Sequence, residues 1–457
     1  MKKIILRFAI AALLLGLSYG VYYAWVSFPI ITGYNAKILA SSVFVAQRSP
    51  AQVTAEELND PLLQLASNHI NYTDSSVTSS IWGMATQKAI YRKGLGVCLV
   101  NELSEGDIRS QRFNLPEPVA DTATTAWPYG YGPIKNESLT ANANALAQAL
   151  DFIFNEPDTA HPKRTRALLI VHDGKLVAER YAAGFSAHTK LLGWSMTKSV
   201  TSACIGRLVQ QGKLGVAAPA PVPEWMLPVD ARHRISLQHL LQQTSGLDFE
   251  ENYGKNSSAT RMLFRKADMG AYTASLPLRS KPGSEWYYSS GNSNILSRIV
   301  RHTVGDANYH RFVYDSLLYA IGMYSAVIEP DANGTFVGSS YMYATARDWA
   351  KFGWLYCNDG IWNGQRLLPD GWVKATATPA AASRGQYGYQ FWLNAGTDAA
   401  GSNRKYPSAP TDMFWADGYE GQFVAIIPSK KLVIVRLGLS KHPWDEDAMF
   451  KAILKAF

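Results

Sequence analysis

The chain is 457 residues long, with 47% hydrophobic and 18% charged side chains. This composition excludes an intrinsically disordered chain and a long solvated coiled coil, and the length is ample for a large buried core. The 44 Lys and Arg exceed the 36 Asp and Glu by 44 − 36 = 8. The basic residues are scattered singly and form no stripe, so we expect no nucleic-acid partner.

The N-terminus carries an uncharged apolar run, residues 8–30, preceded by three basic residues, Lys2, Lys3 and Arg7. The run exceeds the ~7–15 residues of a secretory h-region and matches the ~20 needed to cross a bilayer. Basic residues before a span predict a cytoplasmic N-terminus. We expect residues 1–30 to be a single-pass anchor in the inner (cytoplasmic) membrane, with the remaining chain on the periplasmic side. The alternative is a signal segment that is cleaved, leaving a protein secreted to the periplasm.

The next segment, residues 31–135, is rich in Ser, Thr, Pro and Gly and has few long periodic stretches. We predict an irregular N-terminal extension packed on a larger domain, residues 136–457. The three cysteines are an odd number, so no disulfide framework is encoded. The sequence has neither His-Glu-x-x-His nor Cys-x-x-Cys, so we expect no metal site and no cofactor.

Stronger patterns begin near residue 140. A helix is predicted at Leu146–Phe154, and a hairpin within Ala167–Arg180 around Asp173-Gly174, a strong signal for a two-residue turn. Ser195–Gln211 predicts a helix whose many small residues allow close packing on several sides, so we expect it to be central. Further predicted elements are helices at Leu237–Gln242, Ser293–Val304, from Thr345 and at Asp445–Phe457, and strands at Gln422–Pro428 and Leu432–Leu437. This order predicts an α+β fold, an antiparallel sheet flanked by helices with an all-helical insertion.

The first candidate for chemistry is Ser195 with Lys198, since positions i and i+3 of a helix share a face. A serine hydroxyl becomes a good nucleophile when a base takes its proton, and a lysine acts as that base when its ammonium form is disfavoured. The backbone N–H groups at a helix start can hold a developing oxyanion. Ser-x-x-Lys alone is a weak pattern, and an ordinary exposed helix lysine is the alternative.

Two further segments are candidates. Tyr288, in Tyr288-Ser289-Ser290, has the chemistry to relay a proton to a leaving group, and a packed structural tyrosine is the alternative. Gly418 and Gly421 precede a predicted strand and allow another backbone to lie close alongside. A plain glycine-containing hairpin edge is the alternative there.

These segments, in this order along the chain, are similar to those of a known family. From Leu146 to Phe457 the chain resembles the serine β-lactamase-related hydrolases, including class C β-lactamases, penicillin-binding proteins and esterases, and most of all the 6-aminohexanoate-dimer hydrolase group. Five segments carry the resemblance: GWSMTKSVTSACIGRLV, ISLQHLLQQTSGLDFEENYG, PGSEWYYSSGNSNIL, SSYMYATARDWAKFGWLYCNDGIWNGQRLLP and ADGYEGQFVAIIPSKKLVIVRLG. The resemblance implies a β-lactamase/transpeptidase-like antiparallel sheet flanked by helices plus an all-helical subdomain.

The resemblance also implies roles. Ser195 corresponds to the acylated nucleophile, Lys198 to the base and Tyr288 to the proton shuttle. The oxyanion hole corresponds to the N–H of Ser195 and one from the strand near Gly418 and Tyr419.

The sequence departs from the family pattern at two substrate-pocket candidates. Ser290 replaces the Asn of Tyr-x-Asn. Asp417 lies in the segment that replaces Lys-Thr-Gly, where an acidic residue would repel a substrate carboxylate. We therefore expect a membrane-anchored serine hydrolase of small-molecule amides or esters rather than a true β-lactamase. The alternative is an acylable penicillin-binding or sensor-type protein with little turnover.

Overall fold

The computed structural model describes residues 2–117, 125–130 and 142–457. The chain divides into two compact units, which are described separately. Unit 1 comprises Met1–Ser110, Glu250–Ala267 and Asp331–Asn333. Unit 2 comprises Gln111–Phe249, Asp268–Pro330 and Gly334–Phe457.

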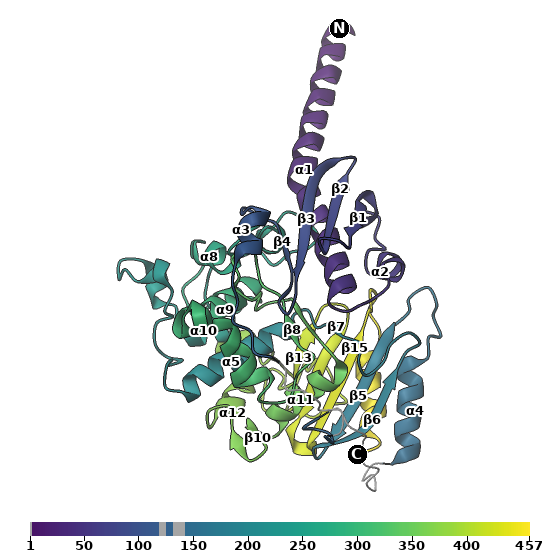
Figure 1. Ribbon diagram of the computed structural model, residues 1–457, viewed down its shortest axis with the longest axis vertical. Coiled ribbons are helices and arrows are strands. Elements are labelled where there is room, and N and C mark those ends of the chain that lie inside the picture. Colours follow the sequence, from purple (N-terminus) through teal and green to yellow (C-terminus); the bar gives the residue numbers. More distant parts are fainter. Residues whose placement is uncertain (1, 118–124, 131–141) are drawn as a thin grey trace. The chain divides into compact units, whose positions relative to one another are not determined.

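Unit 1 is built around one long helix and a four-stranded antiparallel sheet of order β1-β2-β3-β4 (Figure 1). Its helices are α1 (Lys2–Phe44), α2 (Pro50–Glu56), α3 (Glu105–Ser110) and α7 (Ser258–Arg265), and its strands are β1 (Ser67–Asn71), β2 (Ser76–Ile81), β3 (Met84–Arg92) and β4 (Gly96–Leu99). The first half of α1 is exposed, whereas from Ser27 the helix is largely buried against the sheet and α7. Thr32 Oγ1 donates to the carbonyl of Ala85 in β3 at 2.6 Å.

The prediction of an irregular segment after residue 30 is wrong for the described residues up to Ser110, which form a helix end and a regular sheet. Residues 118–124 and 131–135 of that segment lie outside the described part of the chain. The core of unit 1 contains small polar side chains, among them Thr32, Asn35, Ser76 and Ser79, each no more than 1% exposed. An apolar periodicity does not detect strands and helices that bury such residues.

Unit 2 contains a six-stranded antiparallel sheet of order β12-β13-β14-β15-β5-β6. The predicted hairpin is confirmed, since His172 pairs with Lys175 across Asp173 and Gly174, both at positive φ as the tight turn requires. The two predicted C-terminal strands are confirmed as β14 and β15. The strands are β5 (Thr165–His172), β6 (Lys175–Tyr181), β12 (Trp392–Leu393), β13 (Phe414–Gly418), β14 (Gln422–Ile427) and β15 (Leu432–Gly438).

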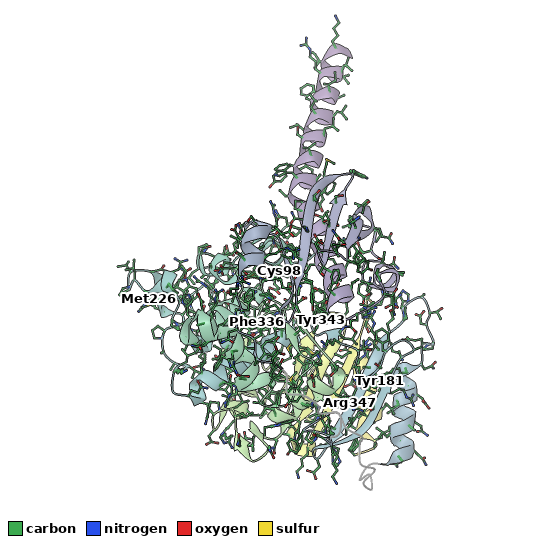
Figure 2. All side chains as sticks on the ribbon, viewed as in Figure 1. Cys98, Tyr181, Met226, Phe336, Tyr343 and Arg347 are labelled. Carbon is green, nitrogen blue, oxygen red and sulfur yellow. The ribbon has the colours of Figure 1, made fainter. Side chains whose placement is uncertain are left out.

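Helices cover both faces of this sheet. On one face α4 (Ala143–Phe154) and α13 (Glu446–Leu454) pack with alternate strand residues such as Trp415, Phe423 and Ile434. On the other face α11 (Ala346–Cys357) crosses β14 and β15, and a Cβ on Gly353 would lie 2.5 Å from Val433 Cγ1, so only glycine permits this approach. Arg347 of α11 donates to Glu179 of β6, beside Tyr181 (Figure 2).

The helix α5 (Met196–Gln210) is buried along almost its whole length, as predicted for a central helix. The predicted helices at 237, 293 and 345 are confirmed, and the α+β fold is therefore confirmed. These and the other short elements are α6 (Leu237–Leu241), α8 (Met269–Ala274), α9 (Ser290–Val304), α10 (Asp306–Val313), α12 (Trp372–Thr376), β7 (Leu191–Leu192), β8 (Val327–Ile328), β9 (Met342–Ala344), β10 (Ile361–Trp362) and β11 (Gln365–Arg366).

Candidate active site

Ser195 stands at the N-terminus of α5 as its N-cap residue, and it is half-buried. Its side chain makes no capping hydrogen bond; its Oγ instead lies 2.9 Å from Lys198 Nζ, one turn along the helix. Within the described residues the backbone N–H of Ser195 has no acceptor. The hydroxyl and the N–H are thus both available to a group that approaches the helix start.

Lys198 is 1% exposed, and three neutral oxygens surround its amine. Besides Ser195 Oγ, these are Ser290 Oγ at 3.0 Å and the carbonyl oxygen of Ser339 at 3.0 Å. The carbonyl can only accept, so one N–H of Lys198 is committed to Ser339. A neutral amine has two N–H groups and one lone pair, so it can donate to Ser339 and Ser290 while its lone pair accepts from the Ser195 hydroxyl.

Tyr288 lies beside this amine, with Lys198 Nζ 4.8 Å from the centroid of its ring. The ring is stacked on Trp392 at 5.4 Å and meets Tyr387 edge-on at 5.9 Å. The face of an aromatic ring attracts a cation, so Tyr288 favours the positively charged form that Lys198 takes after accepting a proton. The structure therefore brings Ser195, Lys198 and Tyr288 together from two distant segments.

A buried network of amides and hydroxyls holds these segments in place. Asn292, at the start of α9, donates to Gln243 Oε1 at 2.8 Å and accepts from Ser245 Oγ at 2.8 Å. Gln390 accepts from Ser293 Oγ and donates to the carbonyls that end α6. Buried polar networks whose members are satisfied fix one arrangement of the chain. The network thus joins the segment around Ser245 to the segment that follows Tyr288.

The end of β13 lies against the chain just before Ser195. A Cβ on Gly418 would be 2.2 Å from the carbonyl oxygen of Gly193, closer than any side chain permits, so only glycine fits there. Tyr419 follows, 62% exposed, with its ring edge-on to Trp194 at 5.8 Å. Trp194 has a φ of 47°, a strained backbone for a bulky residue, immediately before the serine.

The two residues that depart from the family pattern have different surroundings. Ser290 is fully buried and contacts Lys198 directly. Asp417 is half-buried, and its Oδ1 accepts from Trp415 Nε1 at 3.1 Å. Burial raises the pKa of Asp417 to about 6, against the opposing effect of the Lys405 charge.

A comparison with known protein families gives a match over most of the chain. A model of the family described as Beta-lactamase matches residues 153–456, about two thirds of the chain. The chain belongs to the β-lactamase family. Its resemblance to that family, stated above from five segments, is therefore confirmed, and the chain is a hydrolase of this family.

Individual known proteins resemble the chain over much of its length. The 6-aminohexanoate-dimer hydrolase of Paenarthrobacter ureafaciens is 26% identical over 305 residues, which is 61% of this chain and 74% of the relative. Among solved structures, a candidate 6-aminohexanoate-dimer hydrolase from Bacillus anthracis has a TM-score of 0.55 at 22% identity, covering 75% of this chain and 88% of its own. EstCE1, a hydrolase with promiscuous acyltransferase activity, has a TM-score of 0.55 at 15% identity, covering 68% and 98%. These structures show a shared fold.

Three contributors to this β-lactamase-family site were missed by the sequence analysis. The carbonyl of Ser339 has no sequence signature, because every residue has a carbonyl. Gln390 is separated from α6 by about 150 residues, and a single glutamine gives no signal. Trp194 adjoins the serine, but nothing in its identity indicates a positive φ.

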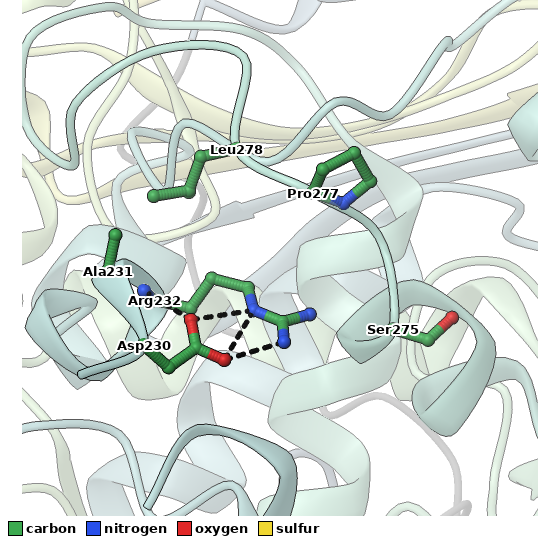
Figure 3. Close-up of a pocket in the computed structure, with 6 residues that line it drawn as sticks. All are labelled: Asp230, Ala231, Arg232, Ser275, Pro277 and Leu278. Atoms are coloured by element: carbon green, nitrogen blue, oxygen red, sulfur yellow. Dashed lines mark hydrogen bonds and ion pairs between the residues drawn. The ribbon is translucent and has the colours of Figure 1, made fainter. Parts of the chain in front are cut away.

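A separate cavity of about 370 Å³ lies in unit 2 and contains none of the predicted site residues (Figure 3). It is lined by Asp230, Ala231, Arg232, Ser275, Pro277 and Leu278. Arg232 lies in an ion pair with Asp230 at 2.6 Å and also donates to the carbonyls of Ala274 and Leu276. The guanidinium is thus already satisfied by protein groups.

Proposed function

We propose that the protein is a serine hydrolase that cleaves an amide or ester bond through an acyl-enzyme on Ser195. The observation that carries this proposal is the 2.9 Å contact between Ser195 Oγ and the buried amine of Lys198. In its neutral form this amine can take the hydroxyl proton through its lone pair. The Ser195 hydroxyl is also half-buried rather than sealed in the core, so a substrate can reach it.

The reaction has two steps. Ser195 Oγ attacks the substrate carbonyl carbon while Lys198 Nζ takes the hydroxyl proton, and the negative oxygen is held by the N–H of Ser195 and one from the strand end near Gly418 and Tyr419. Tyr288 gives its hydroxyl proton to the leaving amine or alcohol and takes in its place the proton that Lys198 received, as the carbonyl re-forms and the bond to the leaving group breaks. Water then attacks the acyl carbon, and its proton returns by the same groups while Ser195 Oγ leaves as a hydroxyl.

Amidase or esterase activity is favoured over β-lactam hydrolysis. The segment at β13 reads Ala416-Asp417-Gly418, with a carboxylate in place of the hydroxyl and lysine that bind a β-lactam carboxylate in the wider family. The curated relative named above acts, by its name, on a 6-aminohexanoate dimer. A linear amide of this kind is therefore one substrate class to test.

The apolar half of α1 supports membrane anchoring. This helix is long and apolar enough to cross a membrane, and its most hydrophobic 18-residue window has a mean hydropathy of 2.1 with none of it buried. The second half of α1 is core of unit 1, so a cut near residue 30 would sever the helix at the edge of a folded body. We propose an uncleaved anchor with both units on the periplasmic side, tested by carbonate extraction and by protease protection in spheroplasts.

Labelling with a fluorophosphonate probe tests the serine chemistry. Wild type should be labelled and Ser195→Ala should not, and equal labelling of both would overturn the proposal. Multiple turnovers on p-nitrophenyl acetate should accompany labelling. A stable adduct without turnover would instead indicate an acylable sensor-type protein.

A further inference from the structure

We propose that Asp417 makes this site prefer substrates that carry a positively charged group and reject those that carry a carboxylate. The inference rests on the proposed function, and it names the substrate class of the same site.

Asp417 occupies an open position on β13. The short strand β12 pairs with β13 at Leu393–Phe414 and Trp392–Trp415, and within the described residues the pairing goes no further toward Gly418. Beyond Trp415 the described part of β13 therefore pairs with β14 alone, and Asp417 comes one residue before the glycine that abuts the Gly193 carbonyl. Asp417 thus adjoins the strand end that lies against the chain before Ser195.

A series of aromatic contacts connects the face of Asp417 to the catalytic amine. Strand alternation puts Asp417 on the same face as Trp415, whose Nε1 donates to it. Trp415 stacks on Trp392 at 6.5 Å, Trp392 stacks on Tyr288 at 5.4 Å, and the Tyr288 ring lies 4.8 Å from Lys198 Nζ. The charge of Lys198 also acts to lower the pKa of Asp417, so the carboxylate lies within electrostatic range of the catalytic amine.

Lys405, whose charge acts on Asp417, does not cancel the charge of that carboxylate. Lys405 Nζ pairs with Glu446 at 3.3 Å and lies over the rings of Tyr406 and Trp415. Glu446 also accepts from Tyr406 Oη at 2.5 Å. With Lys198 neutral, as the base must be before it takes the Ser195 proton, counting Asp417 and Glu446 against Lys405 gives a formal charge of −1 on this side of the site.

A partly buried charge acts on a ligand more strongly than one in bulk water. An ammonium group meets an opposite charge and aromatic faces, both of which attract cations, whereas a carboxylate meets a like charge. The preferred class is therefore an amide or ester with an amino group on its chain. We expect kcat/KM roughly ten-fold higher for the cation than for a neutral analogue, and roughly ten-fold lower for the anion.

The test uses the full chain in detergent and three p-nitrophenyl esters of equal chain length, ending in an ammonium, a methyl or a carboxylate group. Asp417→Asn removes the charge, keeps the shape and retains an acceptor for Trp415 Nε1. It should lower the ammonium-to-carboxylate ratio of kcat/KM about a hundred-fold. The control Asp370→Asn, at a carboxylate 93% exposed in unit 2, should leave that ratio at the wild-type value.

The pH dependence of the wild-type preference is a second measurement. In wild type, the ammonium-to-methyl ratio should rise as the pH increases through about 6, where Asp417 loses its proton. The other titratable or charged groups nearby are Lys405, Tyr406, Glu446, Tyr288 and Lys198, and Asp417→Asn should flatten this rise if Asp417 causes it.

Two results would overturn the inference. One is a wild-type preference for the carboxylate ester, which would make Lys405 the anchoring group. The other is an Asp417→Asn ratio equal to that of wild type. Failure of wild type to turn over any of the three esters, together with absence of probe labelling at Ser195, would instead overturn the proposed function and this inference with it.

Discussion

Unit 2 contains two lysines that are buried in similar ways and have different partners. Lys198 of α5 and Lys351 of α11 are 1% and 0% exposed, and each contacts the residue three positions earlier on its helix. Each also donates to a backbone carbonyl, that of Ser339 or Gly322. The residue three positions earlier is Ser195 for Lys198, but for Lys351 it is Asp348, whose carboxylate lies 3.4 Å from the amine.

The difference shows how a helix can make a buried lysine reactive or structural. A carboxylate partner compensates a buried ammonium and holds it in place, and Ser325 also donates to Asp348 through its N–H and Oγ. A hydroxyl partner does not compensate the charge, but it supplies a proton that the amine can take. We infer that Lys198 serves chemistry and Lys351 serves packing, and variants at the two positions test this.

The largest expected effect is on catalysis at Lys198. Lys198→Met should lower kcat/KM on p-nitrophenyl acetate by about 10⁴-fold or more, because a nucleophile and its base act as one unit. Its free energy of unfolding should fall by only about 1–3 kcal/mol, because Met keeps the length of the side chain and the loss is that of the hydrogen bonds to Ser290 and Ser339. Activity within ten-fold of wild type would show that another group is the base.

The converse is expected at Lys351. Lys351→Met leaves the Asp348 carboxylate buried without its cation, so the free energy of unfolding should fall by about 3–5 kcal/mol. Urea denaturation measures this. The double variant Asp348→Asn/Lys351→Met should recover part of the loss. A folded Lys351→Met protein with a kcat as low as that of Lys198→Met would contradict the distinction between the two lysines.

A smaller effect is expected from Ser290, the neutral oxygen that α9 presents to Lys198. Ser290→Ala removes one acceptor from a buried amine, a loss of about 1–3 kcal/mol that corresponds to roughly 5–150-fold in kcat. The matched control Ser258→Ala, at a buried serine of α7 in unit 1, should leave kcat unchanged. Equal kcat values for Ser290→Ala and wild type would show that this contact does not support the base.

The smallest expected effect is on how stability changes with pH. It concerns Asp417, whose pKa is raised, whereas the pKa of an ion-paired carboxylate is lowered. Burial raises the pKa of Asp417 to about 6, above the usual 3.8, so the folded state holds a proton that the unfolded state has released between these values. Stability is therefore expected to fall as the pH rises from about 4 to 6. Denaturation curves at several pH values should show a flatter profile for Asp417→Asn. A steeper one would contradict the assignment.

The sequence predicted unit 2 well, because its signals are local. The signals of the Asp173-Gly174 turn and of Gly418 and Gly421 act within a few residues. The positions of Ser195 and Lys198 on one helix face also follow from local spacing. The contacts of α5 with Ser290, Ser339 and Gln390 are tertiary. A backbone carbonyl or a single buried glutamine leaves no pattern in the sequence. Unit 1 was missed because its helix and strands bury small polar side chains.

The continuity of α1 has a consequence for where the protein can act. At 1.5 Å per residue, a helix that enters a folded body without a break gives no slack, whereas a flexible linker of n residues would reach about 5–6 Å × √n. In α1 the exposed apolar stretch passes directly into side chains buried in unit 1. With that stretch across a bilayer, the unbroken helix holds unit 1 close to the membrane surface. Such confinement raises the effective concentration of molecules held at the same surface and does nothing for those in bulk solution.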